Sequence, residues 1–142
     1  ERLIGYSIDS MNIRIFTIDE ASSQLPWLES KFQELELIRE EQDSLQAKLL
    51  SLFRQSRGNG KIGMETIISQ TQKALDVTKS RVSELVQDIG DRGIIVRDVN
   101  MGLVDFPAVR EDQEVFLCWV RGEDAIQYWH DSNEGYSSRK VL

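Results

Sequence analysis

Between residues 28 and 53, apolar side chains recur every three or four positions, the spacing of one face of an α-helix. Two series of sevens form a heptad stripe: Leu28, Leu35, Gln42 and Leu49, and Lys31, Ile38, Leu45 and Leu52. Phe32 and Phe53 widen the stripe, as packing against more than one neighbour requires. The polar members Lys31 and Gln42 either set the register and partner number of a coiled coil or face water beside the stripe. The pattern predicts one long helix.

A second heptad pattern follows the glycine-rich segment 54–63, which is typical of a turn. Its positions are Ile68, Leu75, Val82 and Ile89, with Thr71, Thr78 and Leu85. Gly90 stands where a helix C-cap is expected. Each helix is about 25 residues, or roughly 37 Å, long. Two equal helices joined by a short turn predict an antiparallel helical hairpin over residues 18–90.

The start of the hairpin carries a capping signal. Thr17 and Glu20 have the capping-box spacing, in which each side chain accepts the other's backbone N–H. Pro26 lacks an N–H and cannot occupy a helix interior without cost. The sequence therefore predicts a short helix of about 18–25 that kinks or restarts at Pro26.

After Gly93 the period changes from helical to strand-like. Four β-rich runs are separated by turn signals: 94–99, 103–106, 114–120 and 125–130. They predict an antiparallel meander within 93–142, in which residues 136–142 form a last edge strand or a tail. The expected fold class is α+β, a long antiparallel helical hairpin packed with a sheet of about four strands. We expect a single domain over 11–142, with residues 1–10 an extension of doubtful origin.

The net charge and the cysteine count narrow the compartment and the partners expected for the protein. The 142 residues carry a net charge of -7, which disfavours the clustered basic face that nucleic acid requires. The single cysteine excludes an intrachain disulfide and fits a reducing compartment. No apolar run approaches the roughly 18–20 residues of a membrane span, and no signal segment is evident. We expect a cytoplasmic protein without a nucleic-acid or membrane partner.

The only cysteine lies in a run that is apolar on both faces. Residues 115–120 alternate between two hydrophobic faces, which predicts a strand covered on both sides. Cys118 is there expected to be a small buried hydrophobe. The alternative, a nucleophilic thiolate paired with His130, requires a lowered pKa that no neighbouring residue supports.

A metal site is considered for the same stretch. One cysteine and one histidine supply two ligands, whereas a structural zinc takes four. Asp105, Glu123 or Asp131 could complete a mixed set, but no CxxC or HxxxH spacing supports one. The sequence therefore predicts no metal and no cofactor.

Strand pairing about the turn at 121–124 places the polar residues of this region. Residue numbers across that hairpin should sum to about 245, which puts His130 opposite Val115. A tight contact between His130 and Glu123 is therefore not expected, because they lie at opposite ends of the fourth strand.

Arg139 returns after a further turn and should lie near residue 128. We expect its guanidinium to bridge to an acid as a bidentate pair. His130 is expected to find Asp105 or Asp131 instead.

The carboxyl-terminal half resembles the signature of an uncharacterised prokaryotic family, whose members are sometimes named DivIVA-like cell-division proteins. The resemblance is carried by "GLVDFP", "LCW", "GE", "WH" and a closing glycine–aromatic with an arginine; "FTIDEASSQLPWL" resembles the opening of the family. It covers nearly all of residues 14–139. The pattern falls on Gly102, Leu103, Asp105, Phe106, Pro107, Cys118, Trp119, Gly122, Glu123, Trp129, His130, Gly135 and Arg139. Where the family has a proline after the arginine, this chain has Lys140 and Val141.

Two functions follow as hypotheses. The first is a non-enzymatic structural or interaction protein that self-associates through the hairpin, as a homodimer. The second is a small enzyme or ligand-binding domain. The resemblance implies that its polar site would be one cluster of Asp105, Glu123, His130 and Arg139.

Overall fold

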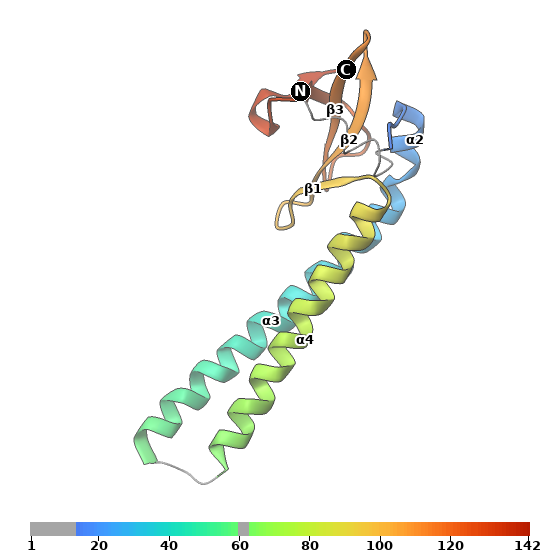
Figure 1. Ribbon diagram of the computed structural model, residues 1–142. Helices are drawn as coiled ribbons and strands as arrows, with labels where there is room; N and C mark the ends of the chain where they lie inside the picture. Colours follow the sequence, from blue (N-terminus) through green and yellow to red (C-terminus); the bar gives the residue numbers. More distant parts are fainter. Residues whose placement is uncertain (1–13, 60–62) are drawn as a thin grey trace. The chain divides into compact units, whose positions relative to one another are not determined.

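The computed structural model describes residues 14–59 and 63–142, so the predicted extension at 1–10 lies outside the described residues (Figure 1). The chain forms two compact units. One is Gln33–Leu85, and the other combines the segment up to Phe32 with Val86–Leu142. No helix in the described part of the chain is long and apolar enough to cross a membrane.

The Gln33–Leu85 unit is an antiparallel helical hairpin, as predicted. It contains most of α3, Leu25–Asn59, and of α4, Met64–Asp91, which lie side by side (Figure 1). Its buried residues follow the predicted heptads: Leu35, Ile38 and Leu52 from α3, and Met64, Thr71, Leu75, Thr78 and Leu85 from α4. The two buried threonines donate their hydroxyls to backbone carbonyls of their own helix, so no polar atom is left unsatisfied by their burial.

The second unit begins with the predicted cap. Thr17 and Glu20 form a capping box, in which the backbone N–H of Glu20 donates to Thr17 Oγ1 at 3.0 Å. The short helix α2 spans Ile18–Ser23, and α3 starts at Leu25. Pro26 thus falls in the first turn of α3, where its missing N–H removes no helical bond. The predicted restart is confirmed.

A five-stranded antiparallel meander fills the rest of this unit, which confirms the α+β class. The strands are β1 Ile95–Asp98, β2 Leu103–Arg110, β3 Gln113–Val120, β4 Tyr128–Asp131 and β5 Lys140–Val141, in that spatial order. The fifth is the short edge strand that the sequence left open as strand or tail. β4 begins three residues later than predicted, because the chain between Arg121 and Gln127 forms turns and irregular structure.

The sheet has one apolar face and one mixed face. The apolar face carries Phe106 and Trp119, whose rings lie 5.1 Å from Phe16 and 6.5 Å from Phe32. These contacts join the segment before α2 and the start of α3 to the sheet. The mixed face carries polar residues of β2, β3 and β4.

The observed register corrects one prediction. His130 lies opposite Phe116, and not opposite Val115. Because side chains alternate between faces, this shift of one residue moves His130 to the face that carries Cys118.

Candidate functional site

Three adjacent strands bring a carboxylate, a thiol and an imidazole together on the mixed face. Asp105 of β2 pairs with Cys118 of β3, and His130 of β4 lies next to them, two residues from Tyr128, the β4 partner of Cys118. None of the three is more than 2% exposed. One ligand atom from each lies within 4.8 Å of the other two. The site is therefore a buried polar cluster within a largely apolar core.

Asp105 is the centre of this cluster. His130 Nε2 lies 3.0 Å from both carboxylate oxygens, and Arg97 Nε donates to Oδ2 at 2.8 Å. A buried carboxylate is costly unless it is paired and hydrogen-bonded. The imidazole and the guanidinium supply this pairing from two different strands.

The second ring nitrogen determines how His130 is protonated. Nδ1 lies 2.9 Å from the backbone oxygen of Asp131, and a carbonyl oxygen can only accept, so Nδ1 carries a hydrogen. The short contact between Nε2 and Asp105 then requires one further proton, shared between ring and carboxylate. The imidazole is thereby held in one orientation from both sides.

The thiol of Cys118 is protonated in this environment. Burial, followed by the negative charge of Asp105, raises its pKa from 9.0 to about 12. A nucleophilic cysteine requires the opposite shift. The expected burial is confirmed, and the thiolate alternative loses its chemical basis.

Cys118 is expected to react with a thiol reagent such as iodoacetamide only after unfolding. The buried and protonated sulfur offers neither access nor thiolate in the native state. Mass spectrometry of labelled protein with and without denaturant measures this. Labelling of the native protein at the rate of a free cysteine would contradict the prediction.

Glu123 and Arg139 form a second pair on the same unit. Arg139 Nη2 lies 2.7 Å from each carboxylate oxygen of Glu123. The guanidinium also stacks on Tyr128, 3.9 Å from the ring centroid. Glu123 Oε1 also accepts the backbone N–H of Val120 at 2.8 Å. The pair therefore links the 121–124 turn to the residue just before the edge strand β5.

The four predicted site residues therefore lie in two pairs, Asp105 with His130 and Glu123 with Arg139. Both pairings agree with the expectation that Arg139 bridges to an acid and that His130 finds Asp105 or Asp131, of which the structure shows Asp105. Cys118 lies between the pairs, because its backbone oxygen is 3.5 Å from Arg139 Nη2. Ligand binding by these residues stays a prediction.

Sequence reasoning missed Arg97. It lies on β1 beside β2, where Ile95 is opposite Asp105, and its Nε donates to Asp105 Oδ2 at 2.8 Å. The pairing shifts between Val96 and Asp98, so strand alternation counted from the sequence did not place Arg97.

The fold and the site define a small α+β protein that combines a helical hairpin with a β-meander. Polar residues of the meander form buried or partly buried pairs. The chain belongs to DUF2203, a family described as an uncharacterized conserved protein, whose model matches residues 14–142. No curated protein matches the chain. The search of the solved structures found no match either.

Proposed function

We propose that this protein is a non-enzymatic interaction module of the cytoplasm, and that it self-associates through its helical hairpin. The observation that carries the proposal is the charge distribution along α3. Residues 33–43 contain five acids and one base, whereas residues 44–58 contain three bases and no acid. A second copy running antiparallel brings the acidic half of one helix against the basic half of the other.

Four of these nine charges fall on a second heptad stripe, separate from the one that faces α4. This α3 stripe consists of Glu40, Asp43, Ala47, Leu50, Arg54 and Arg57, all of them exposed. If two copies cross at Ala47, Glu40 lies opposite Arg54 of the partner subunit. The small alanine side chain lets the helices approach closely, and Leu50, which is 52% exposed, lies one turn from the crossing.

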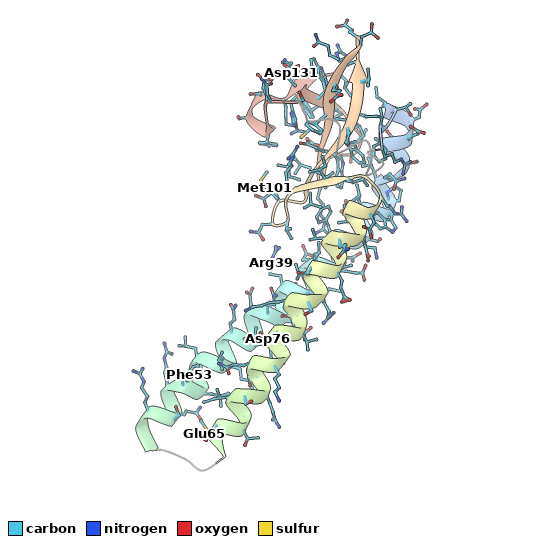
Figure 2. The ribbon with its side chains drawn as sticks, viewed as in Figure 1. Arg39, Phe53, Glu65, Asp76, Met101 and Asp131 are labelled. Atoms are coloured by element: carbon cyan, nitrogen blue, oxygen red, sulfur yellow. The ribbon has the colours of Figure 1, made fainter. Side chains whose placement is uncertain are left out.

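Further apolar side chains on the hairpin support association. Leu37 is 60% exposed, and Phe53, near the end of α3 in Figure 2, is 42% exposed. A hairpin of two helices has no third helix within itself to cover such residues. Burial against a second copy removes this apolar surface from water.

The geometry of the buried pairs favours the non-enzymatic alternative. Asp105 and His130 are almost fully buried, and Arg139 and Glu123 are engaged with each other. The side chains of the first pair are only 1% and 3% exposed, so they offer a substrate no direct access. A role among DivIVA-like prokaryotic cell-division proteins fits this interpretation and stays a prediction, as does the absence of nucleic-acid and membrane partners.

A charge-swap experiment tests the proposal. Sedimentation velocity at micromolar concentration should give a dimer for the native chain. The variants Glu40→Lys/Asp43→Lys and Arg54→Glu/Arg57→Glu should each be monomeric, because like charges then face one another. An equimolar mixture of the two should recover a heterodimer.

The matched control is Lys73→Glu/Lys79→Glu, an equal charge change on α4. It should leave the dimer intact. A monomeric native chain would overturn self-association, whereas a dimer that ignores the charge swap would overturn the α3 stripe as its surface.

A further inference from the structure

We propose that Asp105, Cys118 and His130 bind one divalent transition-metal ion of the zinc type, with the fourth position left to water. The three side chains offer a carboxylate oxygen, a sulfur and an imidazole nitrogen, the donor types that zinc takes in proteins. The candidate atoms all lie within 4.8 Å of one another. Donor atoms bound to one tetrahedral zinc are separated by about 3.3–3.8 Å, so small rotations of these side chains suffice.

The surrounding contacts have the form of an outer coordination shell. A metal-binding histidine almost always donates its second ring N–H to a carbonyl or carboxylate. His130 Nδ1 makes this bond to the backbone oxygen of Asp131 at 2.9 Å, which directs Nε2 toward Asp105. Arg97 holds the carboxylate from its other side through Oδ2. Two of the three ligands are therefore oriented before any ion enters.

Charge and protons balance for a divalent ion. Binding displaces the thiol hydrogen of Cys118 and the hydrogen shared by His130 and Asp105, so two protons pass to solvent. The resulting thiolate and carboxylate neutralise the two positive charges of the metal, and a water molecule completes the coordination. Because binding releases protons, affinity rises with pH.

This site is independent of the hairpin and of self-association. Its nearest alternative is a purely hydrogen-bonded network, in which the same contacts stabilise the core without an ion. The two differ in the state of the sulfur, which bonds to the metal in one and keeps its hydrogen in the other.

Cobalt(II) titration of the full chain, freed of metal by a chelator, separates these possibilities at mildly alkaline pH. The proposal expects one Co²⁺ per chain with a sulfur-to-cobalt charge-transfer band in the near ultraviolet and tetrahedral bands in the visible. Zinc should displace the cobalt and raise the melting temperature. Cys118→Ser, which keeps the approximate size of the side chain and replaces its sulfur by oxygen, should lose the charge-transfer band and bind at least about 100-fold more weakly.

The matched control is Glu114→Gln, an exposed acid on β3, the strand that carries Cys118. It should bind cobalt as the native chain does. Absence of the charge-transfer band from the native chain at excess metal would overturn the proposal. Binding without that band, unchanged in Cys118→Ser, would assign the ion to surface carboxylates and would also overturn it.

Discussion

Replacing His130 with alanine is expected to lower the free energy of unfolding by about 3–5 kcal/mol. The substitution removes the imidazole that lies 3.0 Å from both oxygens of Asp105. It leaves a carboxylate that is 2% exposed and that keeps, among the residues described, only Arg97 as an ionic partner. Removing one partner of a buried ion pair lowers the stability of the fold by more than the intact pair adds to it, because the remaining charge stays in the interior. Urea unfolding monitored by circular dichroism measures the loss.

Two comparisons make the His130 result specific. Asp131→Asn alters an exposed neighbour whose side chain pairs with Lys140 at the surface, and should cost no more than about 1 kcal/mol. The double variant Asp105→Leu/His130→Leu removes both partners and should cost less than the sum of the two single leucine variants, since no buried charge is left unpaired and Arg97 is 43% exposed. Additive losses would show that the pair is not coupled.

Arg139→Ala is expected to destabilise the fold by about 1–3 kcal/mol. The guanidinium side chain is only 11% exposed and holds Glu123 through two contacts of 2.7 Å. Its loss leaves a partly buried carboxylate at the 121–124 turn and removes the stacking on Tyr128. Thermal and urea unfolding of the purified variant measure the change.

Lys140→Ala is the matched control for Arg139. Lys140 is the next residue along the chain and also pairs with an acid, but its side chain is 46% exposed. Such an ion pair contributes about 0–1 kcal/mol. If both variants lost the same stability, burial of the Glu123–Arg139 pair would have no energetic consequence.

Local chemistry made the elements of this protein predictable. The heptad positions, for example Ile38 and Leu75, report a helical period that needs no knowledge of the partner helix. The reciprocal bonds of Thr17 and Glu20 depend only on a spacing of three residues. Pro26 acts through its own missing N–H. Turn residues between the apolar runs predicted the meander. The conformation of each turn, like that of the helix cap, depends on a few neighbouring residues alone.

Sequence by itself thus determined the hairpin, the capped start of the helices, the order of the strands and the burial of Cys118. Only the tertiary structure decided that Asp105, Cys118 and His130 converge. The expected pairing of His130 with Val115 was one residue away from the observed pairing with Phe116. Strand register depends on contacts summed over the whole sheet and on the exact end of each turn. Successive side chains point to opposite faces of a strand. An error of one residue therefore decides whether the imidazole of His130 lies on the same face as a carboxylate 25 positions away or on the opposite face.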